Sequence, residues 1–502
     1  MSVLPNGWAT AKFDSVAEVT DFVANGSFAS LKENVQYRNE GYAVLVRLTD
    51  WKKKWSRQYV YISEESYKFL SKSSLLPGDI VISCVGEPGQ VFQVPDLGMP
   101  TTLGPNSVRL RENSYALDKN FFAYYWKSSA GQGELASITT GTTQLKFNKT
   151  SLRSSTVLLP PLPEQKRIAD KLDSVLARVD ACRDRLDRLP ALLKRFRQSI
   201  LAAATSGKLT EDWRLNHATD TYSEKFSGLL NIQEKKREWL VQNAAHNEVS
   251  RVKNRLVSFE ATSISNSQLP ETWCWAALED ATLMVVDCHN KTAPYQSTGI
   301  PLVRTTNIRD GQFVWDDLRF VGEDTYRFWS KRCFPQPGDI VFTREAPMGE
   351  ASIIPENTKI CLGQRTMLIR PLSECTSANY LLIALLDPKF KERAFQTAVG
   401  TGVKHLRVGD VSELKLPLPP TNEQTEIVRR VDILFAFADR LEARLATARR
   451  QVGQLTPALL AKAFRGELVA QDPADEPAAE LLKRLAAQRE AAPKVKRGRV
   501  RG

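Results

Sequence analysis

Residues 159–165 read Leu-Pro-Pro-Leu-Pro-Glu-Gln, and residues 418–424 read Leu-Pro-Pro-Thr-Asn-Glu-Gln. Each stretch opens a long charged segment, and these segments end at Gly207-Lys208-Leu209 and at Gly466-Glu467-Leu468. The two segments are offset by 259 positions at both ends, so they align without a gap. A period of this length indicates a duplicated module of domain plus segment and excludes a solenoid of small repeats.

Apolar side chains recur along both segments in alternating steps of four and three residues. They are Ile168, Leu172, Val175, Val179, Cys182, Leu186, Leu189, Leu193, Phe196 and Ile200 in the first segment, and Ile427, Val431, Leu434, Ala438, Leu441, Leu445, Ala448, Val452, Leu455 and Leu459 in the second. This heptad spacing predicts two long helices, each with one apolar seam, as in a coiled coil. About 45 residues at roughly 1.5 Å each would give a rod of about 65–70 Å.

Each seam must be buried, and the nearest matched partner lies in the same chain. We therefore expect the two helices to pair with each other as an antiparallel coiled coil about a pseudo-twofold axis. The alternative is that each helix pairs with a second molecule. Pro190 is expected to kink or split the first helix, because proline removes a helical hydrogen bond. Pro457 follows Thr456, a suitable N-cap, so the second helix is expected to restart there.

The duplication extends upstream of the helices. Residues 4–8 (Leu-Pro-Asn-Gly-Trp) are echoed at 269–273 (Leu-Pro-Glu-Thr-Trp), and Pro-Gly-Asp-Ile-Val occurs at both 77–81 and 337–341. We interpret Pro-Gly-Asp-Ile as an architectural turn that leads into a strand. Between these landmarks the two halves differ almost completely. This is the expected result if each half reads something different on a shared scaffold.

The regions that precede the helices have the pattern of mixed α and β structure. Strands are predicted at 59–62, 79–83, 339–343 and 367–370, and helices at about 118–136 and 378–395. The expected fold class is α+β, with two globular mixed α/β domains separated by two long helices that pair as an antiparallel coiled coil. The predicted parts are a first domain at 1–160, a spacer helix at 161–212, a linker with a helix at 213–265, a second domain at 266–420, a second spacer helix at 421–470, and a C-terminal helix with a basic tail at 471–502.

The amino-acid composition indicates the cellular compartment in which the protein is expected to lie. No apolar run approaches the roughly 18 residues of a membrane span, and the first residues lack a signal-peptide pattern. The seven cysteines are scattered without a Cys-x-x-Cys pair, which is typical of a reducing cytosol. We therefore expect a cytoplasmic protein without membrane contact.

The net charge of +12, with a pI near 9.3, points to a polyanionic partner such as nucleic acid. The alternative is charge that only keeps the protein soluble. Motifs for catalysis are absent from the sequence: it has no Gly-x-x-x-x-Gly-Lys loop, no Gly-x-Gly-x-x-Gly fingerprint, no methyltransferase tetrapeptide and no metal-ligand spacing among its four histidines. We expect that the chain performs no chemistry itself and binds no cofactor or metal.

Several basic or polar segments are candidates for DNA contact. Residues 51–57 (Trp-Lys-Lys-Lys-Trp-Ser-Arg) mix cations with aromatic rings, as phosphate-binding loops do, although a solvated loop explains the pattern equally well. Residues 141–146 and 400–407 are polar and basic, and Gln144 or His405 could reach a base edge. The candidate DNA-binding residues are Arg47, Lys52, Lys53, Lys54, Arg57, Gln144, Lys146, Arg304, Arg344, Lys404, His405 and Arg407. Among these, the equivalent positions of Arg47 and Arg304 favour a common backbone contact over base reading.

The chain has a variable domain followed by a helix that opens with Leu-Pro-Pro-Leu-Pro-Glu-Gln, and it then repeats this unit. In this organisation it resembles the specificity subunit of type I restriction–modification enzymes. The residues that carry the resemblance are 159–165, 199–201, 207–214, 423–427 and 461–468, with both Pro-Gly-Asp-Ile turns. The second opening motif departs from the pattern at residues 416–422, where it is shifted. We expect that shift to alter the loop and leave the function unchanged.

The resemblance implies two target recognition domains that bind a bipartite, asymmetric double-stranded DNA sequence, with the helix pair setting the gap between its parts. It also implies two methyltransferase subunits, docked on the helices, that use S-adenosylmethionine, and two restriction subunits that use ATP and Mg²⁺. Those cofactors would belong to the partners. Two alternatives remain: a methylation-only specificity subunit without a nuclease partner, and a coiled-coil scaffold that binds only proteins.

Overall fold

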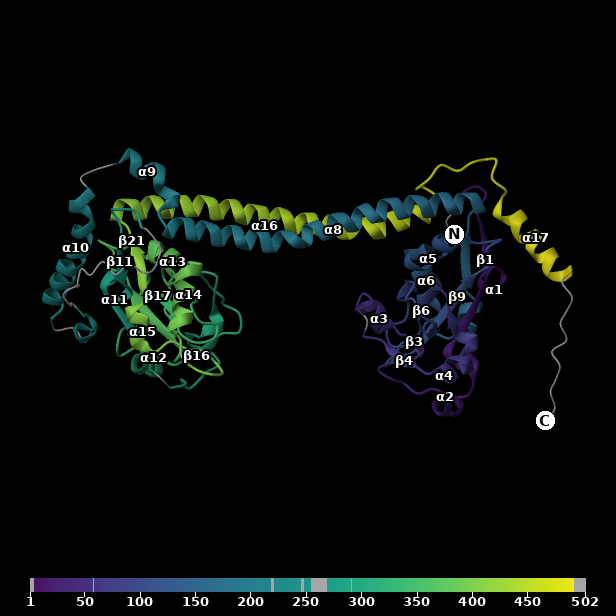
Figure 1. The fold of residues 1–502 in the computed structure, drawn as a ribbon, viewed down its shortest axis with the longest axis horizontal. Helices are drawn as coiled ribbons and strands as arrows, with labels where there is room; N and C mark the ends of the chain where they lie inside the picture. Colours follow the sequence, from purple (N-terminus) through teal and green to yellow (C-terminus); the bar gives the residue numbers. More distant parts are fainter. Residues whose placement is uncertain are drawn as a thin grey trace. The chain divides into compact units, whose positions relative to one another are not determined.

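The computed structural model describes residues 4–56, 58–217, 221–244, 248–253, 269–289 and 291–491. The chain divides into two compact units, one formed by Met1–Asp187 with Thr447–Gly502 and the other by Arg188–Ala446. Each unit contains one mixed α/β domain, the start of one long helix and the end of the other. Figure 1 shows the first domain in purple and blue and the second in teal and green.

The first domain is built on two four-stranded sheets. One has the order β2 (Ala17–Asp21), β9 (Ser107–Glu112), β6 (Ile80–Ser83) and β7 (Val91–Gln93), all antiparallel. The other has the order β4 (Val60–Ile62), β3 (Ala43–Val46), β8 (Thr101–Leu103) and β5 (Ser74–Leu75), in which β3 and β8 run parallel. A separate pair, β1 (Ala9–Lys12) and β10 (Thr156–Leu159), brings the start of the chain to the start of the first long helix.

The second domain repeats this plan. Its larger sheet has the order β12 (Met284–Asp287), β20 (Thr366–Arg370), β17 (Ile340–Thr343) and β18 (Ala351–Ile353). The smaller sheet has the order β16 (Arg319–Val321), β13 (Ile300–Val303) and β19 (Cys361–Leu362), and β13 and β19 again run parallel. The remaining pairs are β11 (Cys274–Ala277) with β21 (Lys415–Leu418) and β14 (Ile308–Arg309) with β15 (Gln312–Phe313). The duplication in the sequence is therefore a duplication of fold.

Short helices complete both units. In the first unit they are α1 (Phe13–Val16), α2 (Phe28–Asn34), α3 (Leu48–Lys52), α4 (Glu64–Phe69), α5 (Lys119–Lys127), α6 (Ser129–Ile138), α7 (Lys149–Arg153) and α17 (Ala478–Ala491). In the second they are α9 (Glu211–Asn216), α10 (Thr221–Gln242), α11 (Leu278–Ala281), α12 (Glu323–Trp329), α13 (Ala378–Leu386), α14 (Pro388–Thr397) and α15 (Val408–Glu413). The four predicted strands are confirmed as β4, β6, β17 and β20.

The predicted helical stretches at 118–136 and 378–395 are confirmed, and each consists of two helices that meet at a capping residue. Ser128 Oγ accepts a hydrogen bond from the Gly131 N–H (3.2 Å) at the start of α6. Asp387 accepts one from the Phe390 N–H (3.2 Å), just before the proline that begins α14. Such caps satisfy the first free N–H groups of a new helix and so end the old one.

The two long helices are α8 (Leu162–Thr205) and α16 (Thr421–Ala463), and both are continuous. The predicted split at Pro190 and restart at Pro457 are wrong. Proline at 190 removes the N–H that would bond the Leu186 carbonyl, and the Arg449 guanidinium donates to that carbonyl instead (3.3 Å). Pro457 is exposed, so water can hydrate the carbonyl that it leaves free. No helix of the described residues has the length and apolar character that a membrane crossing requires.

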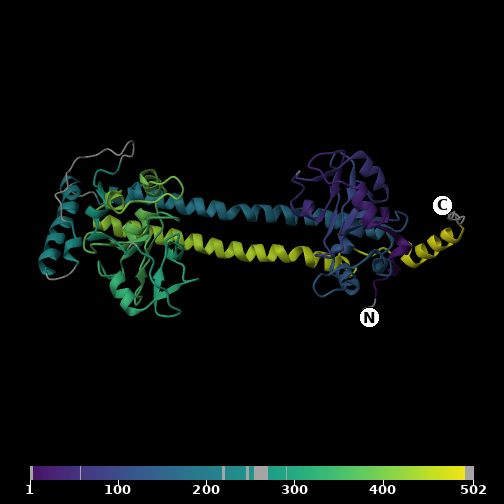
Figure 2. The ribbon, with the colours of Figure 1, turned by 90° about the horizontal axis from the view of Figure 1, so that it is seen from below.

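Within each unit the two helices run antiparallel. In the second unit Arg197 of α8 pairs with Asp439 of α16. Asp212 of α9, which follows α8 in the chain, pairs with Arg430 (2.6 Å), an earlier residue of α16, as expected for antiparallel segments. In the first unit Arg449 pairs with Asp187 (2.9 Å). Figure 2 shows α8 and α16 side by side near each domain. The predicted antiparallel pairing within one chain is confirmed.

Most seam positions are buried as expected. Buried members are Ile168, Leu172, Val179, Leu193, Ile200, Ile427, Val431, Ala438, Leu445 and Val452, and half-buried ones include Leu186, Leu434, Leu441 and Leu459. The prediction is wrong for Cys182, Leu189 and Leu455, which are exposed. The ends of the seams pack into domain cores, so Ile168 and Leu172 join the first core and Ile427 and Val431 join the second.

The end of each helix also contributes to the core of its unit. In the first unit the Phe464 ring of α16 lies 5.2 Å from the Phe121 ring and 5.6 Å from the Tyr125 ring. Leu481 and Leu485 of α17 are buried in the same core. Residues distant in sequence therefore fold with the first domain, as Figure 1 shows for the yellow end of the chain.

Candidate nucleic-acid interface

Three segments lie side by side at the same edge of each domain. In the first domain the Cys84 N–H donates to the Asn106 carbonyl (2.8 Å), and the Phe147 N–H donates to the Cys84 carbonyl (3.1 Å). In the second domain the Arg344 N–H donates to the Arg365 carbonyl (3.1 Å), and the Leu406 N–H donates to the Arg344 carbonyl (2.9 Å). We call these segments the loop platform; it comprises residues 84–85, 104–107 and 146–147 in the first domain and 344–345, 363–366 and 405–406 in the second.

The middle segment of each platform is held close to the parallel strands. The Gly104 N–H donates to the Val46 carbonyl (2.8 Å), and the Gly363 N–H donates to the Val303 carbonyl (2.8 Å). A Cβ at Gly104 would lie 2.6 Å from the first carbonyl oxygen, and one at Gly363 would lie 2.9 Å from the second. Only glycine permits this approach, so both platforms begin from the same backbone geometry.

A short exposed loop precedes the last segment of each platform. Thr140 and Lys146 exchange two backbone hydrogen bonds (2.8 and 2.9 Å), and Val399 and His405 do the same (both 2.9 Å). The five residues between them are exposed in both domains and include the candidates Gln144 and Lys404. The structure therefore brings Gln144, Lys146, Lys404 and His405 to equivalent places next to the platforms.

Arg47 and Arg304 occupy equivalent positions, as predicted. The Arg47 N–H donates to Asp50 Oδ2 (2.8 Å), and its guanidinium donates to Asp50 Oδ1 (2.8 Å). The Arg304 N–H donates to Asn307 Oδ1 (3.1 Å), and its guanidinium donates to the Asp317 carbonyl (2.9 Å). Both side chains begin against a platform glycine. Their contact with DNA stays a prediction.

The lysine-rich segment divides its side chains between core and solvent. The Trp51 ring stacks on Phe92 (5.5 Å between centroids), and the Trp55 ring meets the same ring edge-on (5.9 Å). These indoles are therefore half-buried packing groups of the first domain. Exposed cations surround them: Lys52 pairs with Glu87 (2.5 Å) of the loop after β6, Lys53 donates to Gln58 (3.3 Å), and Lys54 has a positive φ of 52°. Arg57 lies outside the described residues.

Arg344 stabilises the second platform itself. Its guanidinium donates to the carbonyls of Leu406 (3.3 Å) and Gln364 (3.3 Å), which belong to the two flanking segments. The side chain is only 18% exposed. Nearby, Lys404 lies over the Phe395 ring (4.4 Å), and Arg407 is the exposed residue before α15.

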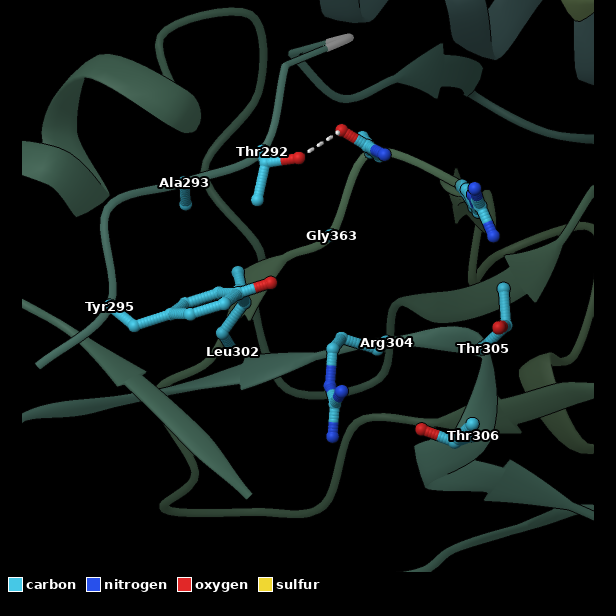
Figure 3. Close-up of a pocket in the computed structure, with 10 residues that line it drawn as sticks. Thr292, Ala293, Tyr295, Leu302, Arg304, Thr305, Thr306 and Gly363 are labelled. Carbon is cyan, nitrogen blue, oxygen red and sulfur yellow. Dashed lines mark hydrogen bonds between the residues drawn. The ribbon is translucent and has the colours of Figure 1, made fainter. Parts of the chain in front are cut away.

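A pocket adjoins the second platform (Figure 3). It is lined by Thr292, Ala293, Tyr295, Leu302, Arg304, Thr305, Thr306, Gly363, Gln364 and Arg365. The Thr292 hydroxyl donates to Gln364 Oε1 across its rim (3.1 Å). In the first domain a cleft lies against the platform and has a more apolar lining, which includes Phe22, Leu31, Val35 and Asn106. The first platform therefore borders a more apolar cleft, whereas the second borders a pocket with a more polar lining.

Two exposed platform residues, Asn106 and Arg365, were missed in the sequence. They lie at equivalent positions of the middle segment, each two residues after its glycine. A signal was present, since Leu103-Gly104 and Leu362-Gly363 repeat at the same offset of 259 positions as the long helices. That repeat marks a shared backbone, and the residues that follow it are where the domains diverge.

Two thiols lie at the platforms: Cys84 belongs to the first, and Cys288 donates to the Gly363 carbonyl of the second (2.7 Å). Burial raises the pKa of the Cys84 thiol to about 11 and that of the Cys288 thiol to about 11, so both stay protonated and poorly nucleophilic at neutral pH. Among the residues that the structure describes, no group of three or more His, Cys, Asp or Glu side chains could hold a metal ion.

The duplicated fold and the pair of platforms define a modular recognition protein, and comparison with known families agrees. The family model for the type I restriction modification DNA specificity domain matches residues 5–191 and 287–448. The chain belongs to this family.

Individual relatives extend along almost the whole chain. It is 30% identical over 498 residues to the type I restriction enzyme EcoBI specificity subunit of Escherichia coli, covering 97% of this chain and 93% of that relative. It is 28% identical over 508 residues to the EcoKI specificity subunit of Escherichia coli strain K12, covering 97% of each. A solved chain from work on complex assembly and conformational transition of the type I R-M system shares the fold, with a TM-score of 0.54 at 17% identity, and covers 93% of this chain and all of its own.

Proposed function

We propose that the chain is the DNA-recognising subunit of a type I restriction–modification complex and that its two domains bind the two parts of a bipartite, asymmetric target. One observation carries this proposal. The two loop platforms share their backbone hydrogen bonds but differ at equivalent side chains: Cys84 with Arg344, Asn106 with Arg365, and Lys146 with His405. Shared backbone gives both domains the same approach to DNA, while different side chains select different bases.

The long helices link the two readers in this proposal. Once one domain has bound its half-site, the other meets its own half-site at an effective concentration that can reach roughly millimolar when the geometry matches. Two readers of modest affinity then suffice for a specific target. The pairing of α8 with α16 within each unit supports the helices as a spacer of defined length.

The helices also offer a surface for partner subunits. Ile433 and Phe437 lie one turn apart on α16 and are 54% and 45% exposed. Exposed apolar side chains close together are typical of protein interfaces. We assign this surface to a methyltransferase subunit of the complex, with two such subunits and two restriction subunits completing the assembly. S-adenosylmethionine, ATP and Mg²⁺ would then be bound by those partners, and this chain would contribute recognition without catalysis.

The docking assignment can be tested with residues that the chain itself provides. The positions of α8 that correspond to Ile433 and Phe437 carry Ser174 and Arg178. The double variant Ile433→Ser, Phe437→Arg is expected to weaken assembly with the methyltransferase subunit in native mass spectrometry. The matched control is Ser174→Ala, Arg178→Ala. Equal assembly by both variants, at unchanged melting temperatures, would contradict the assignment.

DNA binding is tested by titration of duplex DNA at two salt concentrations, with the methyltransferase partners present. Neutralising 6–10 phosphates should make the affinity fall by about 10³–10⁵ between 50 and 200 mM salt. A weak, salt-insensitive interaction would favour a protein-binding scaffold. Replacing residues 1–160 by a homologous segment should change one half-site only, and replacing 266–420 should change only the other. A change in both half-sites from a single replacement would refute independent reading.

A further inference from the structure

We infer that Asn106 and Arg365 are base-reading residues at one equivalent position of the two domains, with Asn106 selecting adenine and Arg365 selecting guanine. This inference rests on the proposed function and names the residues that carry part of its specificity. The first support is position. The carbonyls of both residues accept a platform hydrogen bond, from the Cys84 N–H (2.8 Å) and from the Arg344 N–H (3.1 Å), so their backbones are held in place.

The second support is the state of the Asn106 side chain. Asn106 is exposed and has a positive φ of 67°, which a short polar side chain tolerates. Within the described part of the chain, its side-chain amide makes no hydrogen bond to protein. A free amide carries one donor and one acceptor side by side, and this pair matches N7 and the N6 amino group of adenine in the major groove.

The third support is the way in which Arg365 is held. Its Nε lies 2.9 Å from Glu345 Oε2 in an ion pair, and the side chain is 54% exposed. Among the described residues no protein acceptor is found for its two terminal nitrogens. A guanidinium fixed through Nε presents those two nitrogens as a planar fork, and this fork matches O6 and N7 of guanine. Glu345 is therefore a positioning residue for Arg365.

Three other cations in or beside the platforms use their guanidinium groups in contacts within the protein. Arg344 uses its guanidinium within the platform, and Arg47 and Arg304 use theirs on Asp50 and Asp317. These contacts serve folding in both domains. Base selection then depends on residues whose backbone is held by the platform and whose side chains keep hydrogen-bonding groups available for DNA.

The test compares Asn106→Ala and Arg365→Ala in the full chain assembled with its methyltransferase partners, using methylome mapping and selection from randomised duplexes. Each variant should relax one base position in one half-site, adenine for the first and guanine for the second, with preference at that position falling about 10-fold or more. Glu345→Ala should relax the same guanine position as Arg365→Ala, to a smaller extent. Melting temperatures of the Asn106→Ala and Arg365→Ala variants should be unchanged, because these two side chains are exposed.

The outcomes are distinguishable. Unchanged base preferences in both variants would overturn the inference while leaving the proposed function intact. A uniform loss of affinity with the same preferred letters would also overturn it, since that result identifies phosphate contacts. Absence of any sequence-specific, salt-dependent binding by the unsubstituted complex would instead refute the proposed function.

Discussion

Trp8 donates its indole N–H to Glu164 Oε1 (3.1 Å) across 156 residues of sequence. The same contact joins Trp273 to Glu423 Oε2 (2.7 Å) in the second unit. The neighbouring glutamines repeat a second set of contacts: Gln165 accepts from the Asp118 N–H and Gln424 from the Ser377 N–H, both at 2.9 Å. The motif that opens each spacer helix therefore ties the helix to its domain, which explains why it occurs twice.

The two tryptophan–glutamate contacts differ in what else holds the carboxylate. Glu423 also accepts a hydrogen bond from Thr210 (2.6 Å) and pairs with Arg214. We expect Trp8→Phe to cost about 1–3 kcal/mol of stability, because it leaves a buried carboxylate oxygen without its donor. Trp273→Phe removes the same volume but leaves two partners in place, so its cost should be smaller. Denaturant unfolding of both variants measures the difference, and an equal or larger loss for Trp273→Phe would contradict this account.

The buried carboxyl of Glu164 should make the stability of the protein depend on pH. Burial raises the pKa of its carboxyl above the ordinary value. A folded-state pKa above the unfolded one means that the folded state binds the proton more tightly, so this group favours folding at low pH and loses that contribution as pH rises through the folded value. Glu164→Gln cannot ionise and should therefore gain stability relative to the unsubstituted chain as the pH rises above about 4.3, the ordinary pKa of a glutamate. Urea unfolding across that range would show the opposite trend if the pKa were depressed.

The Pro-Gly-Asp-Ile turns hold a second pair of equivalent contacts. Asp79 binds Arg111 in the first domain, and Asp339 binds Arg370 in the second through two hydrogen bonds of 2.8 Å. Arg370 also binds Glu248 (2.9 Å), and its side chain is 10% exposed against 35% for Arg111. Arg370→Ala strands two buried carboxylates and should cost about 3–5 kcal/mol. Arg111→Ala strands one buried carboxylate, and water can reach the place of the more exposed Arg111 side chain, so it should cost less, as chemical denaturation can test.

Local sequence patterns predicted the individual helices and strands better than they predicted how these helices and strands pair and pack. The heptad seams and the turn-strand motifs depend on neighbouring residues, and nearly all of these elements were confirmed. The parallel pairing of β3 with β8 joins segments more than fifty residues apart and leaves no local pattern. The same limit applies to Trp51 and Trp55, whose packing partner Phe92 lies far along the chain. Asn106 and Arg365 were missed because their exposure depends on tertiary contacts of the platform.

Pro190 is one residue for which the local prediction was wrong. A proline in the middle of a helix leaves the carbonyl of Leu186 without its usual donor, and the guanidinium of Arg449 from the facing helix supplies one (3.3 Å). Pro190→Ala restores the backbone donor, so Arg449→Ala should destabilise the unsubstituted chain more than it destabilises the Pro190→Ala chain. A double-mutant cycle measured by thermal unfolding gives the coupling directly. Zero coupling would mean that the carbonyl is satisfied by water.

The spacer proposal makes a prediction about the DNA target itself. One heptad inserted into both helices at the level of the Asp187–Arg449 ion pair keeps the apolar seams in register. Seven residues lengthen a helix by about 10 Å, which is close to three base pairs at roughly 3.4 Å each. Methylome mapping should then show the same half-site letters separated by a gap about three base pairs longer.

Insertion of the heptad into one helix only is the matched control. It leaves the facing seams offset and should abolish assembly or folding without producing a new gap. An unchanged gap in the double insertion would show that DNA bending or another part of the complex sets the spacing. Loss of the half-site letters in the double insertion would show that the domains do not read independently, because the helices would then be shaping the platforms as well as separating them.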